Sequence, residues 1–205
     1  MLGIFPSFST LLDYYEMGGF VMPPLVLISF VLWYALIYRA MTIRSSQNNP
    51  RELVRKGKKG KKKFYQLNST TADATKFAVE KAKEVSNPVL LKALIDEEFA
   101  RIKDGLAEHK TLVRSLVAIA PLLGLLGTVD GMIETFNSLG DMALFTQSGG
   151  IAGGISKALF TTQMGLAISI PGLLLGRMIE RRERNVYREL DQVRDLVVAG
   201  AKNNP

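Results

Sequence analysis

The sequence predicts an all-α membrane protein with three transmembrane helices and long cytoplasmic helical extensions. Three stretches, residues 17–38, 115–129 and 158–176, contain no Asp, Glu, Lys or Arg. A helix needs about 20 mainly apolar residues to cross the hydrocarbon core of a bilayer. The chain has 205 residues, of which 47% are hydrophobic, so the apolar residues are concentrated rather than numerous. This distribution argues against an ordinary soluble globule.

The distribution of basic residues predicts the orientation in the membrane. Residues 1–38 contain no Lys or Arg, whereas residues 39–63 contain ten. Residues 137–156 again contain none, and residues 177–202 contain seven. Because basic residues accumulate on the cytoplasmic side of membrane proteins, we expect an outer N-terminus and a cytoplasmic C-terminus.

Each element follows from this topology. Residues 1–19 form an outer segment, in which Ser7–Glu16 is expected to be an amphipathic helix. The predicted spans are residues 20–40, 113–136 and 154–177. They are joined by a cytoplasmic segment at 41–112 and an outer loop at 137–153, and a cytoplasmic helix follows at 178–205.

The cytoplasmic segment begins with a basic linker. Residues 56–63 are rich in Gly and Lys and lack an apolar pattern, so we expect this linker to be mobile. Nucleic-acid binding is the less favoured interpretation, because basic clusters beside a span bind anionic lipid headgroups. The expected headgroup contacts are Lys58, Lys59, Lys61, Lys62 and Lys63.

Two helical patterns follow the linker. The first covers residues 71–85, and Asn87-Pro88 marks a stop and a new start. From Pro88 apolar residues recur at helical spacing, and only Gly105 weakens the pattern before the second span. We therefore expect one continuous helix from Pro88 to Phe136.

The second and third spans each carry a stripe of small and hydroxyl residues. Such stripes pack helices closely together in lipid, whereas their hydroxyls also suit a water-accessible lumen; the residues alone leave both interpretations open. The stripe of the second span comprises Pro121, Gly124, Thr128, Gly131 and Thr135. That of the third comprises Gly154, Ala158, Thr162, Gly165, Ser169, Gly172 and Gly176.

The helical rise predicts that two of these hydroxyls lie at one depth. Thr128 lies 14 residues from Arg114, and Thr162 lies 15 residues from Arg177, which is ~21–22 Å in each case. Copies arranged around an axis would therefore form a ring of hydroxyls. Because threonine does not titrate in the physiological range, an ion path would need an ionisable group from another chain.

These two spans resemble a known family. Ala120-Pro-Leu-Leu-Gly-Leu-Leu-Gly-Thr-Val-Asp-Gly-Met-Ile-Glu-Thr-Phe136 and Gly154-Ile-Ser-Lys-Ala-Leu-Phe-Thr-Thr-Gln-Met-Gly-Leu-Ala-Ile-Ser-Ile-Pro171 closely resemble the signatures of the MotA/TolQ/ExbB proton-channel family. The resemblance covers roughly residues 88–200. Three spans and a long first cytoplasmic segment are most similar to the ExbB and TolQ branches.

The resemblance implies a motor subunit in the inner membrane of Gram-negative bacteria. ExbB-like proteins form a pentamer around the transmembrane helices of an ExbD-type dimer, and the proton gradient then drives a TonB-type protein that energises outer-membrane uptake. It also implies that Thr128 and Thr162 line the pore, with Ser169 on the same stripe. The essential titratable aspartate belongs to the ExbD-type partner.

Three charged residues near the outer ends of these spans have two interpretations. Asp130 and Glu134 are either interfacial residues or a vestibule that attracts cations at the pore entrance. Lys157 occupies a position where the family often has a glutamate. It either snorkels outward or acts at the pore entrance.

Composition excludes several classes of function. The chain has no cysteine and one histidine, His109, so disulfides, Cys-ligated metals and multi-histidine sites are ruled out. We expect no enzyme activity and no cofactor. The hypotheses are an ExbB-like subunit for TonB-dependent uptake, a TolQ-like subunit of the Tol-Pal envelope system, and a membrane scaffold without ion flow.

Overall fold

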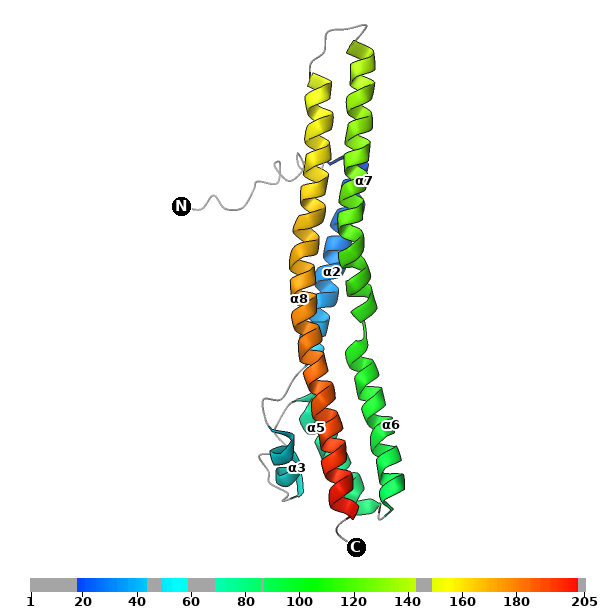
Figure 1. The fold of residues 1–205 in the computed structure, drawn as a ribbon, viewed down its shortest axis with the longest axis vertical. Helices are drawn as coiled ribbons and strands as arrows, with labels where there is room; N and C mark the ends of the chain where they lie inside the picture. The colour runs from blue at the N-terminus through cyan, green and yellow to red at the C-terminus, as the bar shows by residue number, and fades with distance from the viewer. Residues whose placement is uncertain (1–17, 44–48, 59–68, 86, 143–148, 203–205) are drawn as a thin grey trace, which may run out of the picture. The chain divides into compact units, whose positions relative to one another are not determined.

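The computed structural model describes residues 18–43, 49–58, 69–85, 87–142 and 149–202. Within these ranges the regular secondary structure is helical throughout. Three stretches are long and apolar enough to span a membrane: Gly19–Thr42, Pro88–Gly140 and Gly150–Ala201. The elements are η1 (Gly19–Val21), α2 (Met22–Thr42), α3 (Pro50–Lys58), α5 (Thr70–Glu84), α6 (Pro88–Ala107), α7 (Lys110–Met142) and α8 (Gly149–Lys202) (Figure 1).

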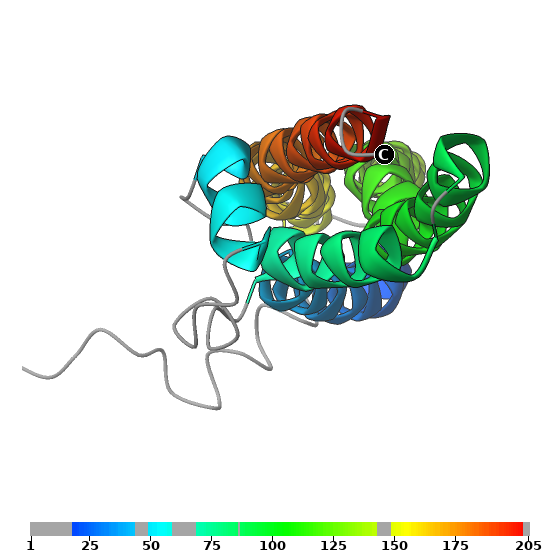
Figure 2. The same cartoon turned by 90° about the horizontal axis from the view of Figure 1, so that it is seen from below.

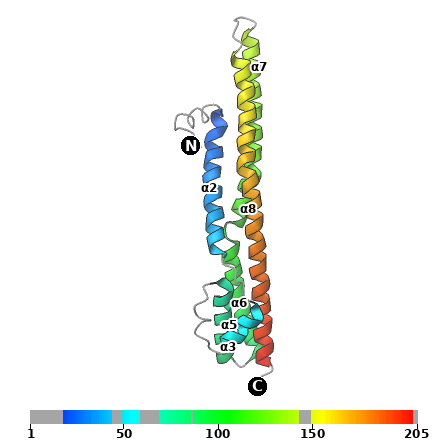
Figure 3. The same ribbon diagram turned by 90° about the vertical axis from the view of Figure 1, so that its left-hand side faces the viewer.

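The chain forms two compact units. Unit 1 consists of residues 1–36 and 111–176, and unit 2 of residues 37–110 and 177–205. In unit 1, α2 packs alongside α7 and α8 (Figure 3). Its core is made of the buried residues Val21, Met22, Leu25, Ile28 and Ala120, with Leu116, Leu123, Phe160, Met164 and Ile168 packed against them.

Unit 2 contains α3, α5, α6 and the C-terminal part of α8. α5 packs against α3 on one side and against α6 on the other (Figure 2). The predicted stop and restart between the two helical patterns is confirmed: α5 ends at Glu84, and the Asn87 side chain caps α6 at Pro88. The face that α8 buries repeats at intervals of four and three residues, as in a coiled coil: Ile179, Glu183, Val186, Leu190, Val193 and Val197.

The expectation of one continuous helix from Pro88 to Phe136 is wrong. α6 ends at Ala107 and α7 begins at Lys110. Between them His109 has a φ of 60°, a left-handed conformation that interrupts the α-helix and costs a non-glycine residue energy. Gly105, the weak point of the sequence pattern, remains helical.

The basic linker also begins later than expected, because α3 covers residues 50–58. Its residues Leu53 and Val54 are buried and anchor this short helix in unit 2. Four of the predicted headgroup contacts, Lys59, Lys61, Lys62 and Lys63, lie outside the described residues, as does the predicted amphipathic helix Ser7–Glu16. Lys58 is the last residue of α3, and its contact with lipid remains a prediction.

Candidate functional site at the α7–α8 interface

α7 and α8 lie in direct backbone contact in unit 1 because glycines face one another across the interface. A Cβ atom added to Gly131 would lie 2.5 Å from the carbonyl oxygen of Gly154, and one added to Gly154 would lie 2.6 Å from that of Gly131. A Cβ added to Gly165 would lie 2.7 Å from the carbonyl oxygen of Ala120. The close-packing interpretation of the glycines is therefore confirmed within a single chain.

The predicted hydroxyl residues Thr128 and Thr162 lie at similar levels on the two antiparallel helices. Gly131 faces Gly154 while Gly124 faces Thr162, so the levels of the two threonines agree to within about one helical turn. The Thr162 hydroxyl donates across the interface to the carbonyl oxygen of Gly124 at 3.3 Å. The Thr128 hydroxyl donates within its own helix to Leu125 at 2.6 Å.

Burial distinguishes the three predicted pore-lining residues. Thr128 and Thr162 are partly exposed, which leaves each hydroxyl within reach of solvent or of another chain. Ser169 is 6% exposed, and its hydroxyl donates to the carbonyl oxygen of Leu166 at 3.4 Å. In the single chain Ser169 is therefore a packed residue, and a pore-lining role for it stays a prediction.

Sequence reasoning missed the hydroxyl that is most deeply buried at this interface. Thr161 is 0% exposed and fills the space beside Gly127. The signal was present in the spacing of Gly154, Ala158, Thr161 and Gly165, which are separated by four, three and four residues. That seam lies beside the stripe through Thr162, and both satisfy helical periodicity.

The three charged residues predicted near the pore entrance form one cluster. The Lys157 Nζ atom of α8 lies 2.7 Å from Asp130 Oδ2 and 2.9 Å from Glu134 Oε2, both on α7. Lys157 is 20% exposed. Its ammonium group therefore binds carboxylates of α7 instead of extending outward alone.

η1 completes this cluster within unit 1. Gly19 has a φ of 57°, and a Cβ atom at this position would lie 2.6 Å from the Lys157 Nζ atom. The left-handed backbone and the close approach both favour glycine here. Gly19 of η1, which directly precedes α2, thus packs against the same ammonium group that joins α7 to α8.

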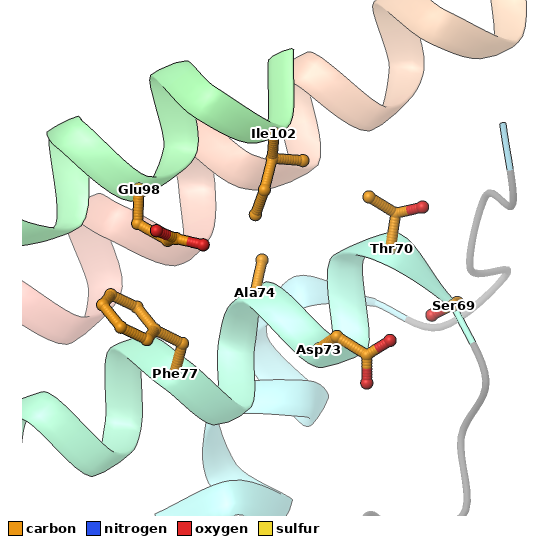
Figure 4. Close-up of a pocket in the computed structure, with 7 residues that line it drawn as sticks. All are labelled: Ser69, Thr70, Asp73, Ala74, Phe77, Glu98 and Ile102. Atoms are coloured by element: carbon orange, nitrogen blue, oxygen red, sulfur yellow. The ribbon is translucent and has the colours of Figure 1, made fainter. Parts of the chain in front are cut away.

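A separate pocket of about 370 Å³ lies between α5 and α6 in unit 2 (Figure 4). Its two carboxylates pair with neighbours on their own helices: Asp73 with Lys76, and Glu98 with Arg101. The pocket contains none of the predicted site residues. Among the described residues, no group of three or more His, Asp or Glu side chains could hold a metal ion.

Comparison with known proteins identifies the family. The sequence profile of the MotA/TolQ/ExbB proton channel family matches residues 66–192, which is more than half of the chain. The chain belongs to the MotA/TolQ/ExbB family. The matched residues include α5, α6, α7 and most of α8, so they contain the glycine contacts, the hydroxyls and the Lys157 cluster.

Several similar proteins are named ExbB or ExbB-like. Biopolymer transport protein ExbB-like 1 of Synechocystis sp. is 44% identical over 94 residues, covering 43% of this chain and 34% of that protein. Biopolymer transport protein ExbB of Aquifex aeolicus is 31% identical over 85 residues, covering 42% and 57%. That of Neisseria gonorrhoeae is 32% identical over 81 residues, covering 40% and 36%. The matches thus span from about a third to just over half of these relatives' length.

Family and fold together define the class of protein. The three long apolar helices and the membership of the MotA/TolQ/ExbB family make this chain a multi-pass membrane protein, most similar to ExbB. The family is one of proton channels rather than of enzymes.

Proposed function

We propose that this chain is the ExbB-like subunit of a motor in the bacterial inner membrane that the proton gradient drives. In this proposal an ExbD-type partner occupies the pore of a ring of copies, and the complex energises a TonB-type protein for outer-membrane uptake. Support comes from the family membership and from the ExbB relatives. The number of copies, five, is taken from the family resemblance.

The observation that carries the proposal is a pair of hydroxyls in a segment without charge. Thr128 and Thr162 are partly exposed and lie at similar levels on α7 and α8. Between Ser115 and Val129, and between Ala158 and Gly176, the sequence has no ionisable residue. Copies of this hairpin would line a lumen with hydroxyls that hydrogen-bond a titratable group without replacing it.

The partner supplies the titratable group in this scheme. A carboxylic acid held in the low dielectric of the lumen has a raised pKa, so it exchanges a proton between its two protonation states within reach of the threonines. The Lys157 cluster stands nearer the outer ends of the same helices and contributes one net negative charge per subunit. A ring of such charges would attract cations to the entrance.

The first test removes the hydroxyls. Thr128→Val and Thr162→Val each preserve the side-chain shape while removing the hydrogen-bonding group. We expect the ring to assemble normally and gradient-driven uptake to fall severely in both variants. Uptake assays in cells, with assembly measured by native mass spectrometry in mild detergent, check this expectation.

Thr42→Val is the matched control. Like the Thr128 hydroxyl, the Thr42 hydroxyl of α2 donates within its own helix, to the carbonyl oxygen of Tyr38 at 2.9 Å, so this variant loses the same kind of bond as Thr128→Val but in another helix. Uptake at the wild-type level in both Thr128→Val and Thr162→Val would favour the scaffold interpretation. A gene neighbourhood encoding Tol-Pal components would instead assign the chain to the TolQ-like system.

A further inference from the structure

Glu183 of α8 is a buried carboxylate that binds two cations from two other helices. Its side chain is 0% exposed. Glu183 Oε2 accepts a hydrogen bond from Arg39 Nη2 at 2.6 Å, and Glu183 Oε1 accepts one from Lys110 Nζ at 2.7 Å. Arg39 itself is 2% exposed. None of these three residues was among the predicted site residues.

Each of the three residues lies close to a point where the chain passes from one unit to the other. Arg39 lies in the last turn of α2, and Lys110 is the first residue of α7. The chain passes between its two units at residues 36–37, 110–111 and 176–177. Each of these three crossing points lies within seven residues of Arg39, Lys110 or Glu183. All three residues belong to unit 2.

The charge balance makes the carboxylate indispensable to the cluster. Arg39 and Lys110 bring two positive charges, and Glu183 is the acidic group that bonds to both. Removal of one partner from a buried ion pair leaves an uncompensated charge, which is far more costly than replacement of the whole group by apolar residues. The Arg39 Nε atom is already buried without an acceptor among the described residues.

The break between α6 and α7 lies beside this cluster. His109, with its left-handed backbone, directly precedes Lys110, and its ring makes an edge contact with Tyr38 at 5.0 Å between centroids. Tyr38 in turn precedes Arg39. A strained backbone persists only where surrounding contacts hold it. Here Tyr38 contacts Glu108 and His109, and the ion pair of Lys110 with Glu183 holds the residue that follows the break.

We propose that Glu183 is a positioning residue. It holds the end of α2 and the start of α7 against α8, so that the three helices keep a fixed axial register while the motor works. In some helical assemblies a buried polar or ionic residue fixes the register of the helices, whereas apolar contacts alone allow neighbouring packings. The inference rests on the proposed motor function. Without the cluster of Arg39, Lys110 and Glu183, proton flow through the ring would no longer drive uptake.

The decisive variant replaces the whole cluster with apolar residues: Arg39→Met, Lys110→Met and Glu183→Leu in one chain. Buried ion clusters replaced in this way generally retain stability, so a purely structural cluster predicts normal uptake. We expect instead that the variant forms the wild-type ring with its ExbD-type partner while uptake falls by at least about tenfold. Native mass spectrometry, thermal stability in detergent and uptake in cells are measured on the full-length chain.

A single substitution and a control accompany the triple variant. Glu183→Gln leaves the buried Arg39 and the partly buried Lys110 without their carboxylate, so we expect loss of both uptake and thermal stability. Glu84→Gln is the matched control, because Glu84 is 55% exposed and pairs with Lys81 on its own helix; it should behave as wild type. If the triple variant fails to assemble, Glu183→Asp decides, since it keeps the charge but withdraws the carboxylate by one methylene group.

The outcomes separate this inference from the proposed function. Wild-type uptake in a stable triple variant, or in Glu183→Asp where that variant decides, overturns the role of Glu183 and leaves the motor function intact. Loss of uptake from an assembled ring in the deciding variant supports the role. A wild-type chain that never supports partner-dependent uptake refutes the proposed function itself, whatever the variants do.

Discussion

Gly131→Ala is expected to separate α7 from α8 and to destabilise the protein by about 2 kcal/mol. The added methyl group would lie 2.5 Å from the Gly154 carbonyl oxygen and 2.7 Å from the Ala158 amide nitrogen. Both are backbone atoms of a long helix, which cannot turn aside as a flexible side chain can. We expect the midpoint of thermal unfolding in detergent to fall. Unfolding is monitored by size-exclusion chromatography after heating.

The same substitution at Gly153 is the control for this prediction. Gly153 also lies in α8, but a Cβ atom there meets nothing within 4 Å. Gly153→Ala gains up to about 1 kcal/mol of helix propensity without a clash, so its unfolding midpoint should stay level or rise. Equal effects of the two substitutions would contradict the close contact described for Gly131.

Lys157→Glu should open the end of the α7–α8 hairpin that carries the Lys157 cluster. It would place a third carboxylate beside Asp130 and Glu134, where Lys157 now provides the shared cation. Because the three side chains are partly exposed, the expected cost is about 1–3 kcal/mol, between the values for surface and buried pairs. Thermal unfolding in detergent measures it, and the double variant Asp130→Lys with Lys157→Asp should recover part of the loss.

Lys76→Glu provides a control of equal exposure. Lys76 is 21% exposed, and its carboxylate partner Asp73 lies on the same helix. Reversal of that charge cannot separate two helices and should cost a few tenths of a kcal/mol. If Lys76→Glu and Lys157→Glu lowered the unfolding midpoint equally, the cluster would have no special role in joining α7 to α8.

The features predicted correctly were those encoded locally or repeated along a helix. The apolar stretches predicted three long membrane helices because length and absence of charge suffice for that inference. Asn87-Pro88 predicted the start of α6 because an Asn cap and a first-turn Pro act within a few residues. Facing glycines predicted close packing, although not which glycine of α7 meets which residue of α8.

The features that were missed depend on contacts between distant residues. Gly105 stays inside α6, and the sequence from Leu106 to Ala120 contains no proline or glycine that would mark the end of that helix. The ring of His109, whose backbone is left-handed, contacts Tyr38, which lies more than 70 residues earlier in the chain. Likewise, Glu183 follows a run of arginines that looks like a solvated face, and only its pairing with Arg39 reveals a buried carboxylate.

Most residues of the candidate site were predicted, but the residues that they contact were not. Thr128 and Thr162 were placed at one depth from helical rise alone, and the facing residues of α7 and α8 agree. Thr161 and Gly127 were overlooked because two neighbouring stripes satisfy the same periodicity. Lys157 was left between two interpretations because its carboxylate partners lie on the other helix of the hairpin.

Proton flux into liposomes tests the central claim most directly, namely that this chain lines the proton path but lacks the group that carries the charge. Liposomes containing only this chain should take up protons no faster than protein-free liposomes. Addition of the ExbD-type partner should create gradient-dependent flux, and replacement of the partner's essential aspartate by asparagine should abolish it. Robust flux through liposomes that contain this chain alone would contradict the account.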